Sequence, residues 1–167
     1  AIYFDIINKK TAQLFAFCAK AGAMASSAKP EAINRLALFG EYLGIIFQLK
    51  DDSFDYILPD QSGEIPGKPV ANDLKEGKVT LPLIYALEHS DEKKSRPYRE
   101  IIAKRHFTKY NIRRIYRFAI ESGGLDYLSK KMEEYKQKAE IILAEFPSSD
   151  ARNSLNLCLE YAASRRV

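Results

Sequence analysis

The sequence predicts an all-α fold, and three observations carry this prediction. The 8 glycines and 7 prolines gather in a few short clusters, which favours long helices over a fold with many turns. Hydrophobic residues make up 46% of the 167 residues, enough to bury a core and to argue against disorder. Almost no stretch alternates apolar and polar residues with the period of a strand. We therefore expect residues 1–167 to form a single all-α domain.

Two long helices are expected in the first third of the chain. Residues 2–21 repeat apolar side chains at helical spacing, until small residues from Gly22 onward interrupt the pattern. Pro30 suits the first turn of a helix, where its missing N–H costs nothing. The second helix is expected over 32–56.

A loop rich in Gly, Pro and charged residues follows over 58–79. Loops of this length inside a compact domain are usually functional or disordered. Helical sequence resumes at Leu81, and Thr80 is expected to cap that helix.

Further helices are expected in the rest of the chain, over 98–104, 109–122 and 125–145. Asp150 is expected to cap the last helix, which should end near Arg166.

Charge and cysteine content exclude several classes of protein. The formal net charge is +4, a mild excess without a basic, aromatic-rich block, so no nucleic-acid partner is expected. No apolar run is long enough to span a bilayer, and no signal peptide is recognisable. Cys18 and Cys158 lie in apolar helical stretches and are expected to be buried thiols in a reducing compartment, the cytoplasm. Because the chain begins without Met, we expect it to be part of a longer protein.

The most informative segment contains Gln48, Asp51, Asp52 and Asp55. On a helix these positions follow i, i+3, i+4 and i+7 and share one face, which usually is apolar and points into a core. Here the face carries an amide and three carboxylates, while apolar residues occupy much of the remaining surface. We therefore expect a largely buried helix whose acidic face meets a cavity or a partner.

Neighbouring carboxylates repel one another by roughly 0.2–0.5 kcal/mol per pair in water, and by more where water is removed. A hard cation would neutralise them. Mg²⁺ is suited to this, because it takes one or two carboxylates together with water and phosphate oxygens. The alternative is a solvated acidic face that binds no metal, or a helical interaction domain that binds a basic partner.

The loop that follows places lysines beside glycines. Lys68 and Lys78 each follow a glycine directly. Ammonium groups on such a loop would take up the charge of a metal-bound diphosphate. Alternatively the loop is solvated, and Lys78 pairs with Asp73 or Glu76.

Motifs along the whole chain carry a family resemblance. They are Lys10-Thr11-Ala12-x-Leu14-Phe15, Phe47-Gln48-x-x-Asp51-Asp52-x-x-Asp55, Gly67-Lys68, Asp73-Leu74-x-Glu76-Gly77-Lys78-x-Thr80-Leu81-Pro82, Glu121-Ser122-Gly123-Gly124 and the Leu155…Tyr161…Arg165 ending. Together they resemble the trans-isoprenyl diphosphate synthases, or polyprenyl synthetases, and among them octaprenyl diphosphate synthases. The central motif looks like that family's second aspartate-rich region and is highly specific, whereas the C-terminal motifs are not.

The resemblance implies a helical bundle of the isoprenoid synthase type, which holds Mg²⁺ on an allylic diphosphate. The diphosphate leaves, the double bond of isopentenyl diphosphate attacks the allylic carbocation, and loss of a proton gives a longer trans-polyprenyl diphosphate. It also implies that Asp51 and Lys10 are catalytic. The implied metal ligands are Asp51, Asp52 and Asp55, and the implied substrate-binding residues are Lys10, Thr11, Gln48, Lys68 and Lys78. For Thr11 the alternative is a hydroxyl bonded back to its own helix.

One part of the family pattern is missing. The first aspartate-rich motif should precede the Lys-Thr helix, so the chain resembles an incomplete bundle, the C-terminal half, and we expect no condensation by these residues alone. Without the partner helices, Ile45, Phe47 and Phe54 should form an exposed apolar patch, so that the chain self-associates, binds the missing half or adjusts its fold. The intact enzyme is expected to be a homo-oligomer, as family members are commonly dimers.

Two related functions stay open at this point. A terpene cyclase also uses an aspartate-rich helix and Mg²⁺, but the Gly-Lys and Glu-Gly-Lys loop fits prenyl elongation better. A non-catalytic subunit of the same fold would have no reason to keep three repelling carboxylates. Product length is not decided by these residues, although the general resemblance favours a medium or long polyprenyl chain.

Overall fold

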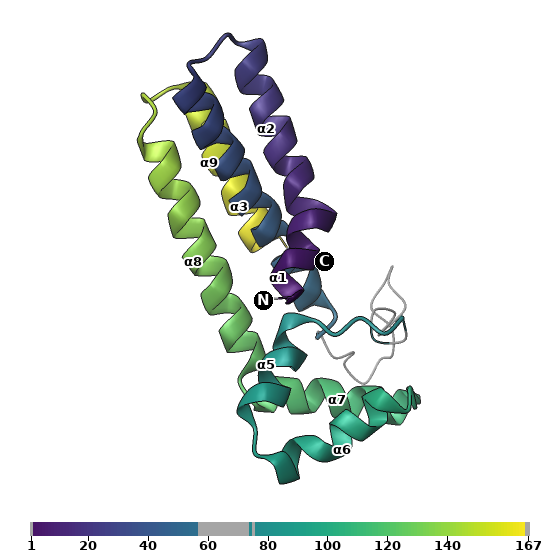
Figure 1. The fold of residues 1–167 in the computed structure, drawn as a ribbon. Coiled ribbons are helices and arrows are strands. Elements are labelled where there is room, and N and C mark those ends of the chain that lie inside the picture. The colour runs from purple at the N-terminus through teal and green to yellow at the C-terminus, as the bar shows by residue number, and fades with distance from the viewer. Residues whose placement is uncertain (1, 57–73, 75, 166–167) are drawn as a thin grey trace. The chain divides into compact units, whose positions relative to one another are not determined.

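A computed structural model describes residues 2–56, 74 and 76–165, and every regular element in these ranges is a helix, which confirms the all-α prediction. Contacts group the chain into two compact units: the first unit comprises Ala1–Asp51 with Lys130–Val167, and the second unit comprises Asp52–Ser129. In chain order the helices are α1 (Ile2–Ile7), the π-helix η1 (Asn8–Ala12), α2 (Gln13–Ala25), α3 (Pro30–Phe54), α5 (Leu81–His89), α6 (Glu92–Ala103), α7 (Lys109–Glu121), α8 (Gly124–Ala144) and α9 (Asp150–Ser164) (Figure 1).

The first unit is a helical bundle in which parts of α3, α8 and α9 run side by side around one core (Figure 1). Its buried side chains include Phe39 and Ile46 of α3, Ile142 and Leu143 of α8, and Leu159 of α9. Burying an apolar side chain of this size stabilises the fold by about 1.5–3 kcal/mol. This core therefore fixes the C-terminal helix against α3.

Two glycines bring α3 unusually close to the N-terminal helices. A Cβ atom at Gly40 would lie 2.5 Å from the carbonyl oxygen of Phe15, and one at Gly44 would lie 2.6 Å from the Cα of Ala12. Neither contact leaves room for a side chain, because the atoms opposite are backbone atoms. The backbones of η1 and α2 therefore pack directly on α3.

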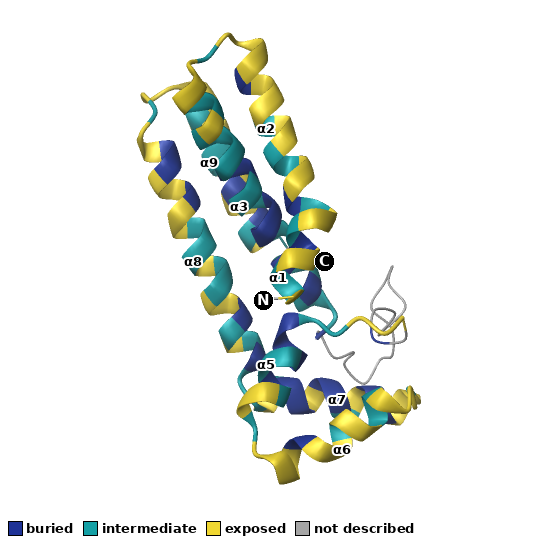
Figure 2. Ribbon diagram, in the orientation of Figure 1, coloured by how far each residue is buried: buried dark blue, intermediate teal, exposed yellow. Residues whose placement is uncertain are grey.

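The second unit has its own core, built by α5, α6 and α7. Figure 2 shows that much of α7 is buried. Its buried residues include Ile115 and Phe118, which belong to one core cluster with Leu83 and Ala86 of α5. A Cβ atom at Gly124 would collide with the carbonyl oxygen of Pro82. This glycine thus allows the first turn of α8 to pack on the first turn of α5.

The starts of several helices differ from the sequence-based expectation. Thr80 stands before α5, but its hydroxyl bonds to the Tyr56 hydroxyl and does not cap the helix. Ser149, in extended conformation, caps α9 with its hydroxyl, so the Asp150 cap was a wrong prediction. Asp150 is the first residue of α9, where its negative charge interacts favourably with the helix dipole. The α6 helix begins at Glu92, earlier than its apolar pattern indicated.

Two expectations about burial are also wrong. Cys18 and Cys158 are exposed, because they lie on sides of α2 and α9 that no described neighbour covers. Ile45 is buried, and Phe47 and Phe54 are partly covered, so no open apolar patch forms there. Large exposed apolar residues of the N-terminal helices are instead Ile2, Ile6, Leu14, Phe17 and Met24. None of the helices in the described ranges is long and apolar enough to cross a membrane.

Candidate functional site

Thr11 and Gln48 meet across two helices of the first unit. The Thr11 hydroxyl donates to the side-chain oxygen of Gln48 at 2.8 Å, and Gln48 is only 8% exposed. The Thr11 hydroxyl thus bonds to a neighbouring helix, in contrast to the alternative of a bond back to its own helix. This contact joins two of the segments that the sequence singled out, the Lys-Thr segment and the acidic helix.

The local backbone explains this meeting. Thr11 lies in η1, a π-helix, and such short wide turns are frequent at functional sites. The close glycine contact one turn before Gln48 holds η1 on α3, and the Asn8 amide adds a hydrogen bond to the Glu41 carboxylate at 2.9 Å. Lys10, next to Thr11 in the same turn, is exposed. The Thr11 hydroxyl, bonded to the buried Gln48 amide of α3, therefore lies in the same turn as the exposed Lys10.

Asp51 is held by the C-terminal end of the chain. Nη2 of Arg165 donates to Oδ1 of Asp51 at 2.6 Å and to the carbonyl oxygen of Phe47 at 3.0 Å. The Arg165 guanidinium also lies 3.9 Å from the centroid of the Phe47 ring. The Asp51 side chain remains 34% exposed, so a ligand can reach it. Sequence reasoning placed Arg165 in a familial ending without a role, because a pairing over 114 residues leaves no local spacing to detect.

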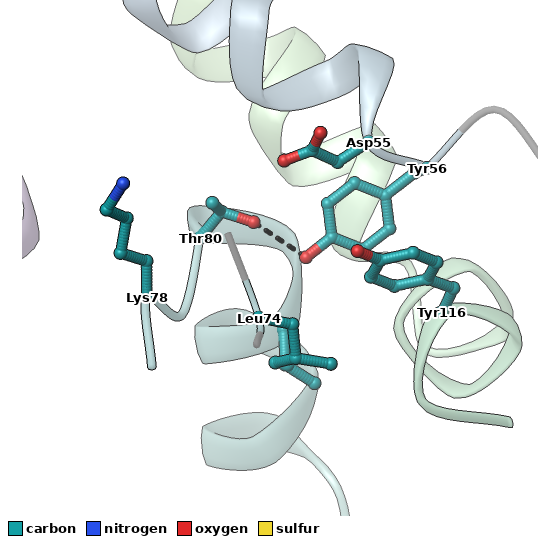
Figure 3. Close-up of a pocket in the computed structure, with 7 residues that line it drawn as sticks. Asp55, Tyr56, Leu74, Lys78, Thr80 and Tyr116 are labelled. Carbon is teal, nitrogen blue, oxygen red and sulfur yellow. Dashed lines mark hydrogen bonds between the residues drawn. The ribbon is translucent and has the colours of Figure 1, made fainter. Parts of the chain in front are cut away.

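Asp52 and Asp55 belong to the second unit. Asp52 is 5% exposed, whereas Asp55 follows the end of α3 and is half-buried. Figure 3 shows the Asp55 carboxylate beside a small hollow that the hydroxyls of Tyr56 and Thr80 also face. The residues that line this hollow are Asp55, Tyr56, Leu74, Lys78, Thr80, Leu83 and Tyr116.

Tyr56 forms a rigid wall of this hollow. Its hydroxyl lies 2.7 Å from that of Thr80, and its ring centroid lies 4.9 Å from that of Tyr116. Burial raises the pKa of Tyr56 far above its ordinary value, and the nearby Tyr116, Asp52 and Asp55 act in the same direction, while the Thr80 bond opposes them. Tyr56 is therefore neutral at physiological pH and serves as a hydrogen-bonding group.

Lys78 lies at the edge of the same hollow. Its ammonium nitrogen is 2.5 Å from Oε2 of Glu76, so the pairing that the sequence left open is present. The Lys78 side chain is 52% exposed, and such a surface pair contributes little that would hold it in place. Gly77 between them has a φ of +83°, which an L side chain adopts only with strain. Lys68 and Asp73 lie outside the described residues.

The carboxylates suit a hard cation that keeps several water ligands better than a cation whose ligands all come from protein side chains. Within the described ranges, no three His, Cys, Asp or Glu side chains are grouped closely enough to hold a metal ion. A cation at Asp51, Asp52 or Asp55 would therefore take most of its ligands from water or from phosphate oxygens. Mg²⁺ commonly binds in this way, through one or two carboxylates.

Comparisons with known proteins agree with these motifs. The family model "Polyprenyl synthetase" matches residues 1–119. The geranylfarnesyl diphosphate synthase of Aeropyrum pernix is 32% identical over 99% of this chain and 50% of its own length. The octaprenyl diphosphate synthase of Escherichia coli is 33% identical over 92% of this chain and 46% of its own.

A solved structure gives the same result for the fold. The polyprenyl synthase of Caulobacter crescentus, complexed with calcium and isoprenyl diphosphate, superimposes with a TM-score of 0.86 at 36% identity. The match covers 99% of this chain and 50% of that one. The chain thus spans about half the length of the proteins it resembles.

Proposed function

Because the chain belongs to the polyprenyl synthetase family, we propose that it supplies one half of a Mg²⁺-dependent trans-polyprenyl diphosphate synthase. The complete enzyme would condense an allylic diphosphate with isopentenyl diphosphate. The observation that carries this proposal is the bond between Thr11 and Gln48, which joins the two motif-bearing segments beside Lys10. The relatives cover roughly twice this length, so the activity is proposed for the whole protein.

The residues of the first unit would hold the allylic diphosphate. Lys10 is exposed and carries a positive charge toward which phosphate oxygens can move. Thr11 and Gln48 would contact the same group, with their mutual hydrogen bond fixing both side chains. Asp51 is the first candidate for a metal ligand, because its side chain is 34% exposed near the C-terminal end of α3.

Asp52 and Asp55 are proposed as further ligands, directly or through water, and Lys68 and Lys78 as further diphosphate contacts. Mg²⁺, when bound, would stabilise the negative charge that develops on the departing diphosphate. The lysine ammonium groups would stabilise the same negative charge. The calcium and isoprenyl diphosphate in the Caulobacter crescentus enzyme support a divalent cation beside a diphosphate here.

Several further properties belong to this proposal. We expect the two units to form a single domain, the whole enzyme to be a homo-oligomer such as a dimer, and its location to be cytoplasmic. Nucleic acid is not an expected partner. The names of the Aeropyrum pernix and Escherichia coli relatives, geranylfarnesyl and octaprenyl diphosphate synthase, refer to prenyl chains of different length, so a medium or long product stays an expectation.

The proposal is tested by calorimetry on this polypeptide. Mg²⁺ is titrated together with a non-hydrolysable allylic diphosphate analogue into the natural chain and into Asp51→Ala. We expect binding that needs both components and that is lost in the variant. If the analogue binds equally without Mg²⁺, or equally to Asp51→Ala, the assigned site is wrong. The full-length protein, measured in the same way, shows whether a negative result arises from the missing half.

A further inference from the structure

Arg165 bonds to Asp51 and is held beside it by contacts with Phe47 and Tyr161. One nitrogen, Nη2, donates to both the Asp51 carboxylate and the Phe47 carbonyl, while the guanidinium stacks on the Phe47 ring. The Phe47 ring also packs against the Phe15 ring, with the two ring centroids 5.4 Å apart. The backbone N–H of Arg165 donates to the carbonyl oxygen of Tyr161, in the last turn of α9. The arginine is thus part of the packed structure of the first unit.

Charge and burial distinguish this pair from an ordinary surface ion pair. The side chains of Arg165 and Asp51 are 16% and 34% exposed, whereas those of Arg35 and Glu145 are 37% and 46% exposed. Partial removal from water strengthens the interaction between charges. A short charge-assisted bond in such a place neutralises much of the Asp51 charge. It also occupies Oδ1, while no described residue donates to Oδ2.

We propose that Arg165 makes Asp51 selective for a cation that arrives with a diphosphate. This inference rests on the proposed function. A guanidinium on one carboxylate oxygen repels a bare divalent cation from the other oxygen. A diphosphate brings negative charge that offsets this repulsion. Cation and diphosphate therefore bind together, and each strengthens the binding of the other by the same factor.

The test uses Mn²⁺, whose free form gives a strong electron paramagnetic resonance signal. Mn²⁺ is titrated into the 167-residue chain with and without inorganic pyrophosphate, against protein-free mixtures. In Arg165→Gln we expect Mn²⁺ alone to bind roughly tenfold more tightly, the order for one unit charge a few ångströms away in a water-like medium. Pyrophosphate should then enhance binding less than in the natural chain.

Two variants control for charge and for position. Arg165→Lys keeps the charge and should behave like the natural chain. Arg35→Gln breaks the comparable pair with Glu145 elsewhere in the first unit and should leave Mn²⁺ binding unchanged. A structural role alone would lower the stability of Arg165→Gln without tightening the binding of Mn²⁺.

The outcomes separate this inference from the proposed function. Unchanged or weaker Mn²⁺ binding by Arg165→Gln overturns the inference, provided that Asp51→Ala still abolishes binding. If Mn²⁺ does not bind even in the presence of pyrophosphate, or then binds equally to Asp51→Ala, the proposed metal site fails and the inference fails with it. Should Arg165→Gln not fold, Phe47→Leu removes the stacked ring and is expected to tighten Mn²⁺ binding in the same direction by a smaller factor. Its failure to do so also counts against the inference.

Discussion

At the scale of single residues, Tyr56 links the site to a measurable pH dependence. Burial raises its pKa, so the folded protein keeps the phenolic proton at a pH where the unfolded chain releases it. The stability that this gives is complete below about pH 10, the unfolded value, and declines as the pH rises further. The free energy of unfolding should therefore fall by about 1.4 kcal/mol more in the natural chain than in Tyr56→Phe between pH 9 and 11.

Urea denaturation at a series of pH values measures this difference. The two proteins differ only at position 56, so the comparison isolates Tyr56. Tyr110→Phe is a matched control for the loss of a phenolic hydroxyl, because Tyr110 is 69% exposed. Parallel curves for the natural chain and Tyr56→Phe would show that Tyr56 ionises in the folded state as readily as in the unfolded chain.

The sequence predicts which residues share a helix better than it predicts the residues they contact. The spacing of Gln48, Asp51 and Asp52 correctly placed all three on one helix that is largely buried. The partners of these residues come from elsewhere in the chain: Thr11 for Gln48, and Arg165 for Asp51. A helical pattern records which side of a helix is polar, and it contains no information about the side chain that will meet it.

At the scale of elements, the contact between η1 and α3 depends on glycine. A Cβ atom at Gly44 would lie 2.6 Å from the Cα of Ala12, so Gly44→Ala must push the two helices apart. We expect a loss of about 1–3 kcal/mol in the free energy of unfolding, the usual cost of overpacking. The displacement should also break the bond between Thr11 and Gln48 and so weaken binding of the diphosphate analogue.

Gly22 offers a matched control for this substitution. It also lies inside a helix, α2, but a Cβ atom there would meet nothing within 4 Å. Gly22→Ala should therefore raise the free energy of unfolding by roughly 0.5–1 kcal/mol, because alanine restricts the unfolded chain. Thermal melts of both variants provide the measurement. Equal effects of the two substitutions would mean that the close contact at Gly44 does not limit stability.

The positions of the helices could be predicted from the spacing of apolar residues, whereas the helix caps and the π-helix η1 could not. The start of α3 at Pro30 and the break at Gly123 follow from backbone rules that act within a few residues. Thr80 is of a residue type that often caps helices with its side chain, yet its hydroxyl bonds to that of Tyr56, which is 24 residues away. The wide turn at Asn8–Ala12 depends on how η1 lies on α3, and such tertiary contacts leave no local signature.

At the scale of the whole molecule, several large exposed apolar residues lie on the N-terminal helices α1 and α2. Ile2, Ile6 and Phe17 are each more than half exposed, whereas Ile45 is buried. The expectation of an exposed apolar face was thus assigned to the wrong helix, because burial of α3 within the first unit is set by α2, α8 and α9. The chain spans about half the length of its relatives.

The isolated chain should bind ligands without completing the reaction. Its sequence contains one aspartate-rich motif of the two that the family pattern requires, so a cation held by Asp51 would lack the carboxylates expected on the opposite side of the diphosphate. Leaving-group stabilisation by preorganised charge is the largest contribution to rate in such chemistry, and removal of a single such group typically costs about 10²–10³ in kcat. We therefore expect no extractable prenyl product when the chain is incubated with Mg²⁺, an allylic diphosphate and radiolabelled isopentenyl diphosphate. An intact synthase of the family, assayed in parallel, is the positive control. Sustained turnover that Asp51→Ala abolishes would show that these 167 residues already contain a complete catalytic site.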